Sequence, residues 1–249
     1  MRLHINVDHI ATLRNARGTP YPDPVDAARV CLDSGAHGIT AHLREDRRHI
    51  VDDDVERLRG TLRATFNLEM AATDEMVGIA CKLHPDVVTL VPERREERTT
   101  EGGLDVAGGR ARLAPIIARL GEAGIRVSLF VEPESAVMEA ARALGAPVVE
   151  LHTGAYAEAV LAGEDERVRA ELARVAAAAA HGASLGLEIH AGHGLTEENV
   201  GVVAAIPEIV ELNIGHALVS AAIFVGLGDA VRAMRAAMER GRTPNSVAA

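Results

Sequence analysis

Short apolar runs in this chain end, again and again, in a polar residue that could take part in chemistry. The run Gly38–Ala41 is followed directly by His42. In the same way, the run Ala64–Leu68 is followed by Glu69. In a closed barrel of parallel strands, all strands end on the same face, and that face holds the active site. The repetition therefore predicts one site that is assembled from the ends of several strands.

Apolar, β-branched runs alternate with longer segments of helical periodicity, and together they predict eight strand–helix pairs. The predicted strands are Leu3–Val7, Gly38–Leu43, Ala64–Glu69, Val87–Val91, Arg126–Val131, Val148–Leu151, Leu187–Ala191 and Ile209–Ile214. The predicted helices are Pro24–Ser34, Asp53–Leu62, Thr73–Leu83, Arg110–Ala123, Glu134–Leu144, Glu166–Leu185, Thr196–Ala204 and Gly228–Arg240. Strict alternation of this kind implies parallel strands with right-handed crossovers. We therefore expect an α/β fold, a (β/α)8 TIM barrel that forms a single domain over residues 1–249.

Three segments exceed a minimal barrel of this kind. Gly154–Leu185 is too long for one crossover helix, so we expect an additional helix there, and a further short one within Ala217–Gly226. Glu93–Gly109 is a long, charged loop after the fourth strand. Loops of that length inside a compact domain are usually functional.

The composition narrows the class of protein further. The chain has 249 residues, of which 48% are hydrophobic, and its formal net charge is −10. This charge argues against a general nucleic-acid binder, which needs clustered cations to neutralise phosphates. It leaves room for small phosphorylated substrates, which need only a few local donors.

Nothing in the sequence predicts a targeting or membrane segment. The first residues lack the apolar core of a signal peptide, and no apolar stretch has the length of a membrane span. Cys31 and Cys81 lie in helical patterns without a metal or disulfide spacing, so we expect them to be small buried hydrophobes. We therefore predict a cytoplasmic protein with no membrane partner.

Three residues are the candidates for acid/base chemistry. The period of two in a strand places Asn6 with Asp8, Thr40 with His42 and Arg44, and Asn67 with Glu69 on faces that we expect to line the barrel. His42 ends a strand beside Arg44, and a carboxylate such as Glu69 at a strand end can have a raised pKa. His193 lies between two glycines, which allow the backbone to approach a ligand closely.

Two groups of residues could bind anions. Backbone amides after strands seven and eight of this fold commonly bind phosphate, and here they belong to Gly192-His193-Gly194 and Gly215-His216. Arg44 and His49 form a second cationic group, and Arg14 and Arg17 could reach a ligand from the first loop. We expect the neighbouring Arg47 and Arg48 to be solvated. Two separate groups suggest two phosphates in one site.

A metal site is the alternative use of the same side chains. The potential ligands are Asp8, His9, His42, His152, His190 and His193. No local pair among them has the spacing of a helical zinc motif, so we predict no metal. We expect His4, His37, His84 and His181 to lie at the surface or at helix ends, without a role.

Several of these segments closely resemble the pyridoxine 5′-phosphate synthase family, over almost the whole chain. The segments that carry the resemblance are Asn6–Gly18, His42–Ile50, Asn67–Met70, Leu90–Glu93, Thr99–Val106, Leu151–Gly154, Ala191–Leu195 and Leu212–His216. Enzymes of this family condense 1-deoxy-D-xylulose 5-phosphate with 3-amino-2-oxopropyl phosphate. The products are pyridoxine 5′-phosphate, inorganic phosphate and water.

The resemblance implies a role for each matching residue. It implies that His42 and Glu69 accept protons and that His193 donates one. The residues implied to bind the amino-ketone phosphate are Asn6, Arg17, Gly194, Gly215 and His216. Those implied to bind the deoxyxylulose phosphate are Asp8, His9, Arg44, His49 and Thr99. It also implies that the protein needs no cofactor, forms an octamer, and closes the Glu93–Gly109 loop over the site.

The residues alone leave two other functions open. One is a different phosphosugar-handling barrel, an isomerase or an aldolase-like enzyme, which would turn over one substrate by itself. The other is a barrel that binds phosphate ligands without catalysis. That second function would leave the acid/base candidates unexplained.

Overall fold

The computed structural model, which describes residues 1–93 and 102–243, contains a closed barrel of eight parallel strands. The strands are β1 (Arg2–Asn6), β2 (Gly38–His42), β3 (Thr65–Ala71), β4 (Val87–Val91), β5 (Arg126–Val131), β6 (Val148–His152), β7 (Glu188–Gly192) and β8 (Ile209–Ile214). They pair in chain order, and β1 pairs with β8 to close the ring. The expected (β/α)8 TIM barrel is thereby confirmed, and each predicted strand overlaps an observed one.

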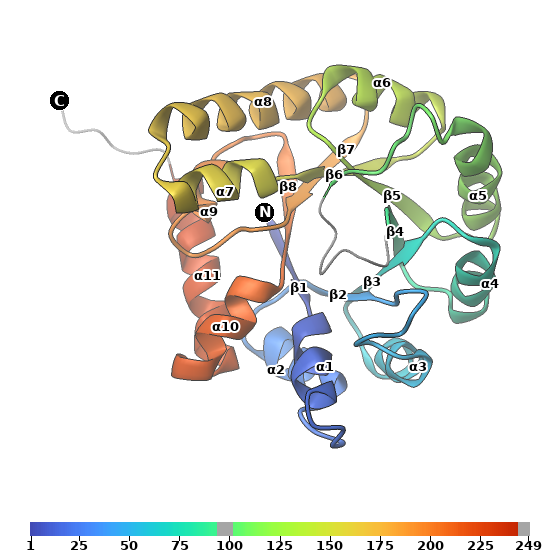
Figure 1. Cartoon of the computed structure of the whole chain (residues 1–249), viewed down its shortest axis with the longest axis vertical. Coiled ribbons are helices and arrows are strands. Elements are labelled where there is room, and N and C mark those ends of the chain that lie inside the picture. The colour runs from blue at the N-terminus through green and yellow to red at the C-terminus, as the bar shows by residue number, and fades with distance from the viewer. Residues whose placement is uncertain (94–101, 244–249) are drawn as a thin grey trace.

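Helices surround the barrel on all sides (Figure 1). They are α1 (Asp8–Asn15), α2 (Pro24–Asp33), α3 (Asp52–Thr61), α4 (Asp74–Leu83), α5 (Arg110–Glu122), α6 (Ser135–Ala143), α7 (Gly154–Ala162), α8 (Asp165–Ser184), α9 (Val200–Ala204), α10 (His216–Val225) and α11 (Leu227–Arg242). The two additional helices expected from the sequence are α7 and α10. Of the described helices, none has the length and apolar character needed to span a membrane. The extent of the single domain, residues 1–249, stays a prediction.

Successive residues of each strand point to opposite sides of the barrel wall. In β3, Phe66, Leu68 and Met70 are fully buried in the hydrophobic core between the strands and the helices. In the same strand, Asn67 and Glu69 point inward and meet polar side chains of neighbouring strands. The core is therefore a ring around the barrel, and the barrel interior carries polar residues.

Two helix starts differ from the sequence prediction. The sequence predicts no helix over α1, because the strand period of two places Asp8 with Asn6 on one strand face. The Asn6 side chain accepts the backbone N–H of Asp8 at 2.9 Å, which ends β1 and turns the chain into the helix. The helix predicted from Thr196 begins only at Val200, because the Asn199 side chain folds back and accepts the Thr196 N–H at 2.8 Å.

Candidate active site

A cavity of about 600 Å³ lies at the carboxyl ends of the strands. Its lining contains Asn6, Asp8, His9, Thr12, His42, Arg44, Arg48, His49, Glu69, Val91, Phe130, Glu150, His193, Gly194, Leu195, Thr196, Asn213, Ile214, Gly215, His216 and Ala217. The three predicted acid/base residues are all among them. This is the size of a small-molecule site. Most of the lining residues are charged or polar, which suits a small polar ligand.

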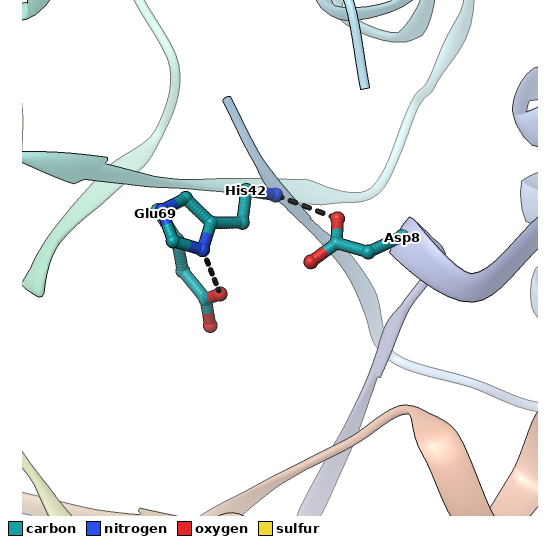
Figure 2. A group of neighbouring side chains, drawn as sticks. All are labelled: Asp8, His42 and Glu69. Atoms are coloured by element: carbon teal, nitrogen blue, oxygen red, sulfur yellow. Dashed lines mark hydrogen bonds and ion pairs between the residues drawn. The ribbon is translucent and has the colours of Figure 1, made fainter. Parts of the chain in front are cut away.

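His42 and Glu69 lie side by side because β2 and β3 pair in register at these two residues. Figure 2 shows His42 between Asp8 and Glu69. The backbone N–H of His42 donates to Asp8 Oδ1 at 2.8 Å, and the ring nitrogen Nδ1 of His42 lies 4.0 Å from Glu69 Oε2. On its other side, His42 Nε2 lies 2.8 Å from Glu93 Oε1. The imidazole is therefore held between carboxylates on both of its nitrogens.

The environment of Glu69 favours its protonated form. Burial, with the negative charges of Glu150 and Asp8, raises the pKa of Glu69 well above its usual value, and the hydrogen bond from Asn6 only partly offsets this. Burial also raises the pKa of Glu150, which points into the barrel from β6. A carboxyl whose pKa is raised toward neutrality can both take and give a proton during turnover.

Asp8, His42 and Glu69 could also hold a metal ion. One potential ligand atom of each residue lies within 4.8 Å of the others. Both oxygens of Asp8 already accept hydrogen bonds, from the His42 N–H and from the Asn6 amide. The prediction that the site needs no metal therefore stays a prediction, with these three residues as the place to test it.

His193 lies directly after β7, away from His42 around the barrel mouth. Its φ is +81°, a conformation that side-chain-bearing residues rarely adopt, and Gly194 follows with φ +78°. Burial, together with the charge of His152, lowers the pKa of His193 to about 4. Unusual backbone angles of this kind concentrate at functional sites.

The backbone amides predicted to bind one phosphate lie at the start of α10. Gly215 precedes this ten-residue helix, and His216 is its first residue. A Cβ at Gly215 would lie only 3.0 Å from Asn6 Cβ, so the glycine lets Asn6 and the helix start pack closely. The N-terminus of a helix favours a phosphate because its amides are unpaired and its dipole is positive there.

The second group of candidate anion-binding residues, Arg44 and His49, follows β2, and β1 separates it from α10 around the ring. Arg44 is only 3% exposed and lines the cavity. Burial lowers the pKa of His49, which therefore favours its neutral form. Arg48, which was expected to be solvated, is 28% exposed, pairs with Asp46 at 2.6 Å and also lines the cavity. The expectation for Arg47 holds, since it pairs with Asp52 and Glu75 on the surface.

The first loop contributes less than the sequence suggested. Arg14 donates to both oxygens of Asp54, at 2.6 and 2.8 Å, and to the His49 carbonyl. It therefore stabilises the segment that contains His49 and does not line the cavity itself. Arg17 is exposed and does not line the cavity. His9 does, with its ring 4.7 Å from that of His216. Thr99 lies outside the described residues.

Sequence reasoning missed two carboxylates of the site, Glu93 and Glu150. Glu150 had a readable signal, because the period of two places it on the same face as His152. Of these two residues, Glu150 lines the cavity and His152 does not. Glu93 had no such signal, since its contact with His42 depends on the path of the chain after β4.

Comparisons with known proteins point to one family. The family described as pyridoxal phosphate biosynthesis protein PdxJ matches over residues 3–240. Curated relatives named pyridoxine 5′-phosphate synthase include one from Xanthobacter autotrophicus, 60% identical over 97% of this chain and 94% of its own length. Another, from Rhodospirillum rubrum, is 59% identical over 96% of this chain and 95% of its own.

Solved structures with little sequence identity share the fold. One is 3-hexulose-6-phosphate synthase from Salmonella typhimurium, with a TM-score of 0.62, 14% identity and coverage of 96% of this chain and 100% of that one. Another is thiamine phosphate pyrophosphorylase from Pyrococcus furiosus, with a TM-score of 0.61, 15% identity and coverage of 96% of each chain. Because the family matches over residues 3–240 and the curated relatives are 59–60% identical over 96–97% of the chain, the chain belongs to the PdxJ family, the pyridoxine 5′-phosphate synthases.

Proposed function

We propose that the cavity condenses 1-deoxy-D-xylulose 5-phosphate with 3-amino-2-oxopropyl phosphate to give pyridoxine 5′-phosphate, inorganic phosphate and water. The observation that carries the proposal is the placement of His42, Glu69 and His193 around one cavity whose lining also includes two separate groups of candidate phosphate-binding residues. Two phosphorylated substrates can then be held with their reacting carbons between the acid/base residues. Holding both together supplies a large part of the rate enhancement.

The two substrates would occupy the two anion-binding groups. The amino-ketone phosphate is assigned to the start of α10, with Asn6, Gly194, Gly215 and His216 as its cavity-lining contacts. The deoxyxylulose phosphate is assigned to the other group, with Asp8, His9, Arg44 and His49 as its cavity-lining contacts. The assignments of Arg17 and Thr99 stay predictions from the resemblance.

The proposed chemistry begins with an imine between the substrates. The amine of one adds to the ketone of the other, and water leaves. The only lysine of the chain, Lys82, is on α4 with its side chain 83% exposed, so no lysine is placed to form an imine with the substrate. The imine carbon therefore belongs to the deoxyxylulose half.

The later steps are proton transfers and eliminations. Glu69 or His42 removes a proton from carbon to form an enamine, and phosphate then leaves the deoxyxylulose half. Water adds at the carbon that lost phosphate, and the ring closes onto the remaining carbonyl. Two further waters leave, one with the hydroxyl of the ring-closing deoxyxylulose carbon and one with the oxygen of that carbonyl, and the ring becomes aromatic. Positioned acids and bases suffice for such steps.

His193 would be the proton donor. Its pKa of about 4 means that the imidazole is neutral at pH 7 in the empty cavity. Two bound phosphates bring negative charge into the cavity, and negative charge nearby favours the imidazolium. His193 would therefore gain its proton with the substrates and deliver it during turnover.

The test is product formation by the purified protein with both substrates in the presence of EDTA, followed by absorbance and chromatography. Product only when both substrates are present supports the condensation and removes a metal requirement. Turnover of one substrate alone would favour a phosphosugar isomerase or aldolase instead. Binding of phosphates without turnover would favour a ligand-binding barrel. The octameric assembly and the cytoplasmic location stay predictions.

A further inference from the structure

A carboxylate–imidazole pair, Glu132 and His152, lies behind His193 and has no role in the chemistry described so far. Glu132 directly follows β5, and His152 ends the neighbouring strand β6 (Figure 1). Glu132 Oε1 lies 2.8 Å from His152 Nδ1. The His152 side chain is only 8% exposed, and His152 does not line the cavity. Any effect of the pair on substrate must therefore pass through another residue.

That residue is His193, whose ring lies against His152. The ring centroids are 4.9 Å apart and the planes meet at 68°, an edge-to-face contact. The Phe130 ring completes the packing, at 5.2 Å from His152 and 6.3 Å from His193. The position of the His193 ring in the cavity wall thus depends on the position of His152.

The carboxylate fixes which nitrogen of His152 carries a proton. The hydrogen bond from His152, aided by the Gly103 N–H and by Arg174 against the cost of burial, lowers the pKa of Glu132 to about 2. Glu132 is therefore an acceptor, and His152 Nδ1 must donate. His152 Nε2 is buried and has no hydrogen-bond partner among the described residues.

A glycine keeps space open beside this free nitrogen. A Cβ at Gly154 would lie 2.4 Å from His152 Nε2 and 3.2 Å from His193 Cδ2. The first distance is a clash, so the two rings meet at a point where the chain has no room for a side chain. Nε2 of His152 and Cδ2 of His193 thus border the same small space beside Gly154.

Glu132 has a second set of contacts, which could be purely structural. The Gly103 N–H donates to the same Oε1 at 3.0 Å, and Arg174 Nη1 lies 3.5 Å from Oε2. Arg174 in turn pairs with Glu171 at 2.9 Å and lies 3.9 Å from Glu134. These contacts tie the chain after β4, the end of β5 and α8 together, so a test must separate stability from function.

We propose that Glu132 and His152 are positioning residues for the condensation, which act through His193 by holding its ring in the cavity wall and placing a carboxylate-backed imidazole against it. The proposal rests on the proposed function, since it requires His193 to be the proton donor. In other catalytic sites a carboxylate orients a histidine through a hydrogen bond to one ring nitrogen. Here the oriented histidine, His152, contacts His193 and not the reacting groups.

The experiment compares Glu132→Gln with the matched control Glu134→Gln in the full chain. Both changes remove one carboxylate near Arg174, but only Glu132 contacts His152. For Glu132→Gln we expect kcat to fall about tenfold or more, a smaller effect than the about 100-fold or greater loss expected when an acid/base group itself is removed, while KM for both substrates changes less than about threefold. Glu134→Gln should keep the wild-type kcat.

The pH profile of kcat distinguishes a positioning role of Glu132 and His152 from a purely structural one. The neighbouring His152 lowers the pKa of His193. His152→Gln removes that interaction, so the pKa of His193 should rise, and the limb on which activity falls with increasing pH should move to higher pH. Glu132→Gln removes the acceptor that holds the His152 ring beside His193, so it should move the same limb.

Three results would overturn the proposal. One is an unchanged kcat in Glu132→Gln. Another is a loss of kcat that merely follows a loss of thermal stability, with the pH profile unmoved. The third is an equal effect in the Glu134→Gln control. Failure of the proposed function is recognised separately, because the wild-type protein would then form no product, or His193→Asn would retain full turnover.

Discussion

The ion cluster at the other end of the barrel predicts that stability depends on pH through one histidine. His190 is 4% exposed and lies between two carboxylates, with Nε2 at 2.8 Å from Glu188 Oε1 and Nδ1 at 3.1 Å from Glu211 Oε1. Although burial opposes the charge, these hydrogen bonds raise the pKa of His190 to about 9. Arg2 and His4 also face Glu211, at 2.7 and 3.3 Å.

The size of the effect follows from proton linkage. The folded protein holds the His190 proton more tightly than the unfolded chain, whose histidine has a pKa of 6.5. The stabilisation is therefore fully present below pH 6.5 and is lost as pH rises through about 9. With about 1.4 kcal/mol for each pH unit of difference, it amounts to about 2–3 kcal/mol at pH 7 and almost nothing at pH 10.

The perturbation is His190→Gln, which keeps hydrogen-bonding atoms but carries no charge at any pH. Urea unfolding is followed by circular dichroism at pH 7, 8, 9 and 10, at one protein concentration because association shifts apparent stability. We expect the wild-type advantage over the variant to shrink by about 2–3 kcal/mol across this range. Cys31, whose pKa burial raises to about 12, titrates in both proteins and cancels. A wild-type advantage that stays constant from pH 7 to pH 10 would refute the reasoning.

Three further predictions concern the active site. Glu69→Gln should lower kcat about 100-fold or more in steady-state assays, with KM changed only a few-fold, because it removes an acid/base group but keeps its shape; full turnover would remove Glu69 from the chemistry. Gly215→Ala should raise KM for the amino-ketone phosphate about tenfold, or about 1.4 kcal/mol, because the new Cβ crowds Asn6 at 3.0 Å; an unchanged KM would contradict this. Turnover should be the same with and without EDTA, whereas a loss restored by a divalent metal would assign Asp8, His42 and Glu69 as ligands.

The architecture was predictable because its signals are local. Every strand carries its own apolar run, and the barrel follows from eight of them in alternation with helices. The sequence did not predict α1 because its eight residues are largely polar and its N-cap residue, Val7, makes no side-chain capping hydrogen bond. What starts this helix is the turn made by Asn6, which no periodicity reveals.

The site was predictable where chemistry follows a strand end, as at His42, Glu69 and His193. It was not predictable where a contact joins segments far apart in the chain. Glu132 after β5 contacts His152 at the end of the neighbouring strand β6, and nothing near either residue in the sequence indicates the other. His4 shows the same limit, because the expected surface residue is 1% exposed inside the barrel, where burial lowers its pKa to about 4.

Because the strand side chains alternate between the core and the barrel interior, neighbouring strand positions should respond differently to mutation. Outward residues such as Leu68 and Leu90 are fully buried in the ring-shaped core, whereas their inward neighbours, such as Glu69 and Thr89, belong to the polar interior. In a mutational scan read for both protein abundance and activity, a change at an outward position should deplete the protein itself. A change at an inward position near the cavity should leave abundance intact and remove activity. Mutational tolerance along each strand would then alternate with a period of two, and the two readouts would be out of phase.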